Sequence, residues 1–132
     1  MAYNLTFYGD SPFRHELRLI ALIHDTFKCK VDPSRPKVGE NHHAMIARRF
    51  AENFLDDPKL LNIIEKHDDA YNAWRKGDRG GDWERAHQEA LSLITFFGPN
   101  LPLYIAFYEC DAKTGDKTLD PFVWFLDIKM SS

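Results

Sequence analysis

The chain has little cysteine, no excess of positive charge and no long apolar run. Its two cysteines, Cys29 and Cys110, are too few for a disulfide framework and form no CxxC pair, so we expect free thiols. The net charge of −3 argues against nucleic acid as a partner, because nucleic-acid-binding domains are usually basic. No apolar run approaches the roughly 18 residues that span a bilayer, and the first residues lack signal-peptide character. We therefore expect a cytoplasmic protein without a membrane partner.

The composition and the spacing of apolar residues predict one all-helical domain over residues 1–132. Hydrophobic residues make up 44% of the chain and charged residues 28%, which is ordinary for a globular protein. Residues 1–12 indicate an irregular arm, and about five to six helices follow, separated by proline and glycine. Their expected starts are Ser11-Pro12, Asn41, Asp57-Pro58, Asp82, Leu101 and a short last segment around Phe122.

Histidine and aspartate recur at the ends of these predicted helices. His24 and Asp25 close the apolar segment Leu17–Ile23, and adjacent residues on a helix lie about 100° apart, so both can lean towards one cation. His43, His67 and Asp111 follow on later helical segments. Mixed imidazole and carboxylate ligands suit manganese, iron, cobalt, nickel or zinc better than calcium. One or two such ions are what a phosphoester hydrolase needs.

The segment from Leu19 to Lys28 resembles the signature of the HD-domain superfamily of metal-dependent phosphohydrolases. In that family an apolar helix ends in a His-Asp pair, often with a lysine three residues on, which is Lys28 here. The similarity extends over roughly residues 13–126. It implies a compact helical bundle, one or two divalent transition metals and a small phosphorylated substrate, with nucleotides leading. The implied metal ligands are His24, Asp25, His43, His67 and Asp111, and Asp25 and Lys28 are the implied catalytic residues.

The chain departs from the family pattern upstream of the His-Asp pair. Family members place a further histidine ligand on an earlier helix, whereas the 23 residues before His24 contain only His15. Helix geometry puts His15 on the opposite face from His24 and about 13 Å away, so it cannot share the ion. We expect the first metal position to be weakened, or filled by another residue of the N-terminal arm.

A second alignment places the His-Asp pair at His67-Asp68, which also follows an apolar segment. His42 and Asp68 are then alternative metal ligands. The helix phase favours His43 over His42, because His43 shares a face with Ala47, Phe50 and Phe54, which we expect to point inward. The first alignment is preferred because the approach to His24-Asp25 is more apolar.

Substrate contacts and the class of function stay more open. Basic side chains near the predicted ligands could meet a phosphate: Lys28, Arg48, Lys113 and Lys117. A degenerate HD domain with a binding or regulatory role is one alternative. A di-iron oxygenase of the HD type is another, because the same ligands could hold two irons. The sequence does not determine the oligomeric state.

Overall fold

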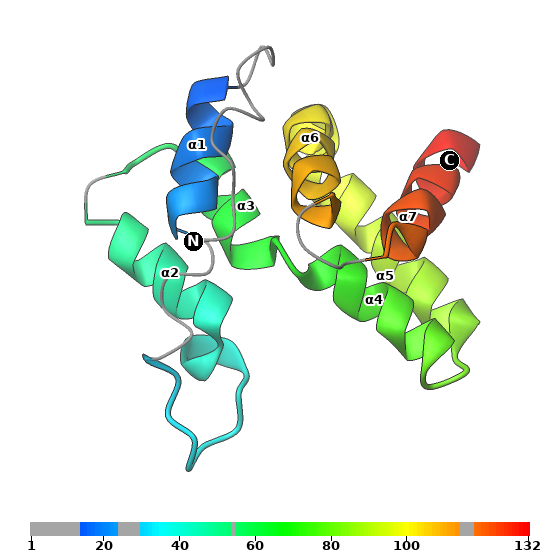
Figure 1. Ribbon diagram of the computed structural model, residues 1–132, viewed down its shortest axis with the longest axis horizontal. Helices are drawn as coiled ribbons and strands as arrows, with labels where there is room; N and C mark the ends of the chain where they lie inside the picture. The colour runs from blue at the N-terminus through cyan, green and yellow to red at the C-terminus, as the bar shows by residue number, and fades with distance from the viewer. Residues whose placement is uncertain (1–13, 24–29, 54, 114–117) are drawn as a thin grey trace. The chain divides into compact units, whose positions relative to one another are not determined.

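A computed structural model describes residues 14–23, 30–53, 55–113 and 118–132 (Figure 1). Every regular element in these ranges is a helix, which confirms the predicted all-α class. The α-helices are α1 (Arg14–Ile23), α2 (His43–Ala51), α3 (Pro58–Lys66), α4 (Asp69–Asp78), α5 (Trp83–Phe97), α6 (Leu101–Ala112) and α7 (Asp120–Ser131). Two single-turn 3₁₀ helices, η3 (Gly39–Asn41) and η4 (Gly98–Asn100), precede α2 and α6.

The chain divides into two compact units after His67. The first unit contains α1, α2 and α3, and both α1 and α2 pack on α3. Its described core is aliphatic: Leu17 and Ile20 of α1, three alanines of α2, and Ile63 and Ile64 of α3 are buried. That residues 1–132 form a single domain remains a prediction, and the two units are described separately below.

Helix α2 turns a different face inward from the one expected. Its buried residues are Ala44, Ala47 and Ala51, whereas Phe50 is 44% exposed and Phe54 lies outside the described residues. Residues four apart on a helix are rotated by about 40° relative to one another, so a series of residues at four-residue intervals does not stay on one face of the helix. Alanines at the contact also allow α2 to approach α3 closely.

Asn41 was expected to cap α2, but it organises the loop before that helix. Its buried side chain accepts a hydrogen bond from the Asp32 N–H at 2.8 Å and donates to the carbonyls of Asp32 and Pro36 at 3.0 Å. The cap is instead His42, whose Nδ1 accepts from the Ala44 N–H. A fixed loop therefore leads directly into the histidines at the start of α2.

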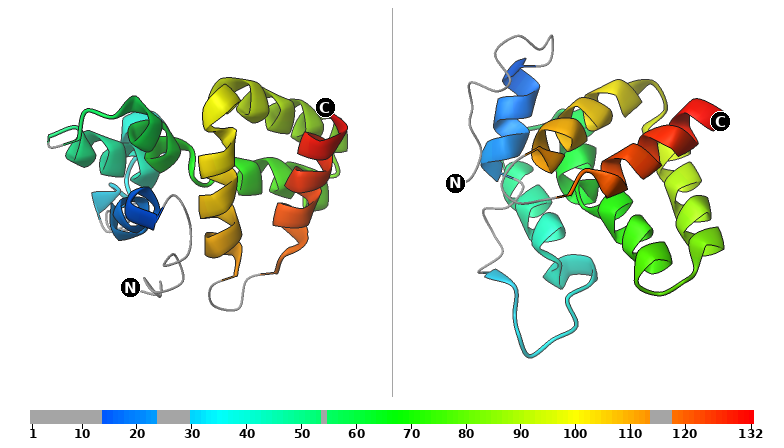
Figure 2. Two further views of the ribbon diagram at one scale, coloured as in Figure 1. Left: turned by 90° about the horizontal axis from the view of Figure 1, so that it is seen from above. Right: turned by 45° about the vertical axis from the view of Figure 1, so that its right-hand side comes forward.

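The second unit contains α4 to α7 and is held by aromatic packing. α4 and α5 pair as a helical hairpin, and α7 packs on both; α6 turns sharply away from α5 at η4 (Figure 2). The rings of Phe97 and Tyr104 stack with centroids 4.3 Å apart. Phe125 meets Tyr104 edge to face, and it is completely buried.

Gly77 allows the two helices of the hairpin to approach closely. It is buried in the last turn of α4, and a Cβ placed there would overlap the indole ring of Trp83 at the start of α5. That ring also contacts Trp124 of α7, with centroids 6.0 Å apart. Glycine normally weakens a helix interior, but here its missing side chain makes room for an aromatic one.

Several helix ends follow the expected residues, and one was missed. Asp57 caps α3 and Asp82 caps α5 through side-chain hydrogen bonds to backbone N–H groups. Gly98 ends α5 with a φ of 49°, a left-handed value that favours glycine. The sequence pattern gave no sign that α3 ends at Lys66 and a separate helix begins at Asp69.

One segment, Trp83–Ala112, is long and apolar enough to cross a membrane by length and composition alone. The most apolar 18-residue stretch within it has a mean hydropathy of 1.5. From the sequence we expected no apolar segment of this length. The segment comprises α5, η4 and α6, whose inward residues form the core of the second unit. A buried core helix passes the same test, so the finding is weak support for a membrane span.

Candidate metal centre

His67 lies at the junction where α3 ends, and its ring is fixed by the backbone. It is the helix C-cap residue and is 2% exposed. Its Nδ1 lies 2.8 Å from the Ile64 carbonyl oxygen, which can only accept, so Nδ1 carries the proton and donates it. Nε2 is then the ring nitrogen that can bind an ion. Metal-binding histidines in proteins are usually oriented in this way.

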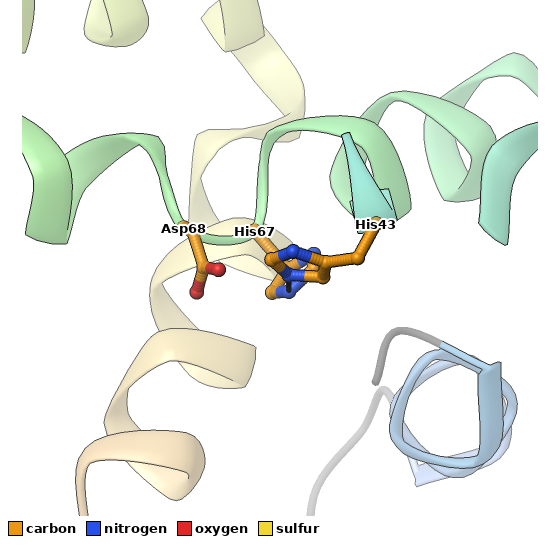
Figure 3. A group of neighbouring side chains, drawn as sticks. All are labelled: His43, His67 and Asp68. Atoms are coloured by element: carbon orange, nitrogen blue, oxygen red, sulfur yellow. Dashed lines mark hydrogen bonds between the residues drawn. The ribbon is translucent and has the colours of Figure 1, made fainter. Parts of the chain in front are cut away.

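His43 brings a second imidazole to the same point from the first turn of α2. Its Nε2 lies 3.4 Å from the Nε2 of His67, although 24 residues separate the two in sequence. The packing of α2 on α3 within the first unit makes this approach possible. Figure 3 shows the two rings converging from their separate helices.

Asp68 adds a carboxylate beside the two rings. It directly follows His67 and occupies the N-cap position of α4. Its side chain makes no capping hydrogen bond to the backbone of that helix. One ligand atom from each of His43, His67 and Asp68 lies within 4.8 Å of the others (Figure 3). The sequence suggested Asp68 only as an alternative ligand, and the structure brings it into this cluster.

The cluster has the donor chemistry and the spacing that a transition metal needs. Two nitrogens each about 2.1 Å from one tetrahedral ion lie about 3.4 Å apart, which is the separation of the two Nε2 atoms. Two imidazoles and a carboxylate are a common donor set for zinc, iron and manganese. The residues present therefore fit a divalent transition metal.

Other residues predicted for the site are distributed more widely. His24, Asp25 and Lys28 lie outside the described residues, as does Lys117. His42 serves as the cap of α2 and is not part of the cluster. The cluster thus contains His43, His67 and Asp68 of the predicted ligands.

Two predicted substrate contacts are engaged with acidic side chains. Arg48 donates from Nη1 to Asn62 Oδ1 at 2.8 Å and to Glu65 Oε1 at 2.9 Å, which ties α2 to α3. Its Nε also donates to Glu52. Lys113 pairs with Glu109 one turn earlier on α6, and this pairing raises the pKa of the lysine. Both cations therefore have acidic partners within their own unit.

Asp111 is buried near the end of α6 in the second unit. Its charge acts on Tyr108, one turn earlier: burial raises the pKa of that phenol first, and the charges of Asp111 and Asp68 raise it further. The charges of Asp111 and Asp68 therefore both disfavour ionisation of this tyrosine. Tyr108 carries no functional signal in the sequence, because a tyrosine in an apolar run is usually a core residue.

Comparison with known families gives one match. The family model described as HD domain matches residues 2–95, and this range includes His43, His67 and Asp68 but not Asp111. Searches of curated proteins and of solved structures found no match. The family model covers more than half of the chain and extends over the whole histidine and aspartate cluster, so this chain belongs to the HD domain family.

Proposed function

We propose that the chain is a metal-dependent phosphohydrolase that acts on a small phosphorylated molecule, with nucleotides as the first compounds to test. The HD domain match supports this class of activity. The observation that carries the proposal is the pair of imidazoles with Nε2 atoms 3.4 Å apart, one of them fixed by the Ile64 carbonyl. A cytoplasmic location, without a membrane or nucleic-acid partner, is part of the proposal.

His43 and His67 are the proposed metal ligands in both alignments of the family signature. The His-Asp pair differs between them: it is His67 and Asp68 in one, and His24 and Asp25 in the other. Asp111 is a proposed ligand in both. Manganese, iron, cobalt, nickel and zinc all suit these donors, as one ion or two. When it is bound, such an ion neutralises phosphate charge and makes water acidic enough to react near neutral pH.

The residues of the chain then have separable tasks. The Ile64 carbonyl holds the proton of His67 on Nδ1, so no tautomer change is needed before the ring binds an ion. Asp68 supplies a carboxylate beside the two rings. Lys28 is the proposed phosphate contact. Arg48 would first have to leave Glu52 and Glu65 to reach a substrate.

Metal analysis of single variants tests the ligands and chooses between the two alignments. The full chain is purified without chelator, and its metal content is compared with that of His43→Ala, Asp25→Ala and Asp68→Ala. We expect about one or two equivalents in the parent, a loss in His43→Ala, and a loss in whichever aspartate variant marks the true pair. His15→Ala, which changes an exposed residue of α1, is the matched control and keeps its metal.

A phosphoester panel with added manganese, cobalt or nickel then tests the reaction. Hydrolysis by the parent and none by His43→Ala supports the proposal, provided that far-ultraviolet circular dichroism shows equal helix content. A parent without metal after titration contradicts it and favours a binding or regulatory domain. Iron-loaded protein that consumes oxygen and leaves phosphoesters intact favours the di-iron oxygenase.

A further inference from the structure

Arg48 joins the two helices that carry the imidazoles of the candidate metal centre. His43 lies in the first turn of α2, and His67 is the C-cap residue of α3. The Nη1 atom of Arg48 donates hydrogen bonds to Asn62 Oδ1 at 2.8 Å and to Glu65 Oε1 at 2.9 Å, both on α3. All of these residues belong to the first unit. The arginine is therefore a polar link between the helices of the two ligands, within one compact body.

This bridge and the two imidazoles follow the same antiparallel alignment of α2 with α3. Five residues separate His43 from Arg48 on α2, and five separate Asn62 from His67 at the end of α3. The close approaches join His43 to His67 and Arg48 to Asn62. A helix rises about 1.5 Å per residue, so the bridge lies about 7.5 Å along the helices from the imidazoles. The register that satisfies the bridge is thus the register that brings His43 to His67.

The apolar contact of α2 fixes this alignment less firmly. The buried residues of α2 are Ala44, Ala47 and Ala51, and methyl groups interlock less with a neighbouring helix than large side chains do. Polar groups can specify the register of two helices where apolar packing allows several. Arg48 is suited to this task because Glu52, one turn later on α2, accepts a hydrogen bond from its Nε at 3.1 Å and orients the guanidinium.

A metal site places a narrow limit on the separation of its two nitrogens. Two nitrogens that each lie about 2.1 Å from one ion are at most about 4.2 Å apart, and the Nε2 atoms of His43 and His67 are 3.4 Å apart. The remaining margin of about 0.8 Å is smaller than the roughly 1.5 Å by which one residue advances a helix. A small movement of α2 along α3 therefore weakens ion binding without unfolding the unit.

We propose that Arg48 is a positioning residue, which fixes the register of α2 on α3 and so holds His43 at the distance from His67 that one ion requires. The inference rests on the proposed function, because it takes these two histidines as metal ligands. It gives Arg48 a role other than the substrate contact that the sequence suggested. Arg48 acts through Asn62 and Glu65 on the alignment of the helices, and it touches neither the ion nor the substrate.

Cobalt titration of the metal-free full chain tests the inference. Co²⁺ is the probe because its visible absorption reports both its binding and the geometry of its ligands. We expect Arg48→Met to bind Co²⁺ about fivefold more weakly, the factor that a partly exposed bridge supplies, with an altered absorption spectrum at equal helix content. Loss of a positive charge near a cation would by charge alone strengthen binding. The sign of the change therefore separates positioning from charge.

Arg49→Met is the matched control, because it changes the neighbouring arginine of the same helix. Arg49 pairs with Glu40 and Glu52, neither of which belongs to α3, so its loss does not weaken Co²⁺ binding. Asn62→Leu removes an acceptor on the α3 side and is expected to weaken Co²⁺ binding as Arg48→Met does. The variant that carries both Arg48→Met and Asn62→Leu should lose less than the product of the two single losses, because both remove the same bond.

Each outcome of the titration bears on a different claim. Unchanged Co²⁺ affinity and spectrum in Arg48→Met overturn the inference, as does an equal loss in Arg49→Met or a pair of single losses that multiply in the double variant. A parent that binds no Co²⁺ overturns it together with the proposed function. Weaker binding by Arg48→Met, in a protein that hydrolyses no phosphoester, supports the inference and overturns the proposed function alone.

Discussion

The two units of this chain are stabilised by different kinds of contact. In the described part of the first unit, the core is built from alanine, leucine and isoleucine, and side-chain hydrogen bonds from Arg48 and Asn41 hold its elements in place. In the second unit, rings pack on rings across α5, α6 and α7. The imidazoles of the candidate metal centre belong to the first unit, as does the arginine that bridges their helices.

The two kinds of contact hold their helices in place with different amounts of buried area. Aromatic rings bury large apolar areas with few rotatable bonds, so they fix positions firmly. Small aliphatic side chains with polar bridges hold helices together with less buried area. We therefore expect the loss of a core ring in the second unit to cost more than the loss of a polar bridge in the first unit.

Removing a core ring gives the largest expected effect. Phe125→Ala should lower the free energy of unfolding by about 3–5 kcal/mol, because it leaves a cavity against Tyr104 and Tyr108. Phe50→Ala in the first unit, where the ring is 44% exposed, should cost less than about 1 kcal/mol. Urea unfolding of both variants measures the difference. Equal losses would contradict the contrast between the units.

Removing the bridge between α2 and α3 has a smaller expected effect. Arg48→Met should lower the free energy of unfolding by at most about 1 kcal/mol, because the paired groups are partly exposed and screened. The loss should shrink as salt is added. Arg85→Met on α5, where the arginine is 64% exposed and pairs with Glu89, is the matched control and should lose less. An Arg48 that contacts substrate would instead change substrate affinity at unchanged stability.

The smallest expected effect concerns the thiol of Cys110 on α6. Burial, followed by the charge of Glu109, raises the pKa of this thiol. Since only the thiolate reacts with iodoacetamide, the rate at a given pH should be below that of the unfolded chain, and its midpoint should lie at higher pH. Alkylation rates across a pH series, in a Cys29→Ala background with and without urea, measure the shift. Coincident midpoints would show that the second unit does not shield this position.

Local chemistry made much of the fold predictable. Asp57, Asp82 and Gly98 mark helix ends because capping side chains and a left-handed glycine act within one turn. The break at His67-Asp68 could not be predicted in the same way, since neither residue is a strong helix breaker. The predicted inward face of α2 was wrong because it was drawn through the large side chains of Phe50 and Phe54, whereas the buried residues of this helix are alanines.

The candidate site was predictable only where residue type alone identified it. Histidine and aspartate stand out in any chain, so His43, His67 and, as an alternative ligand, Asp68 could be named before their surroundings were known. The sequence could not show that His43 and His67 meet, because this depends on how α2 packs against α3.

The close approach of Trp83 to Gly77 has a consequence for how this chain can vary. Any side chain at position 77 would displace the indole ring from α4 and disturb its contact with Trp124. Positions 77 and 83 are therefore expected to change together: an alanine at 77 becomes tolerable once residue 83 is small. In homologues, we expect side-chain size at these two positions to covary, so that a larger residue at one is accompanied by a smaller residue at the other.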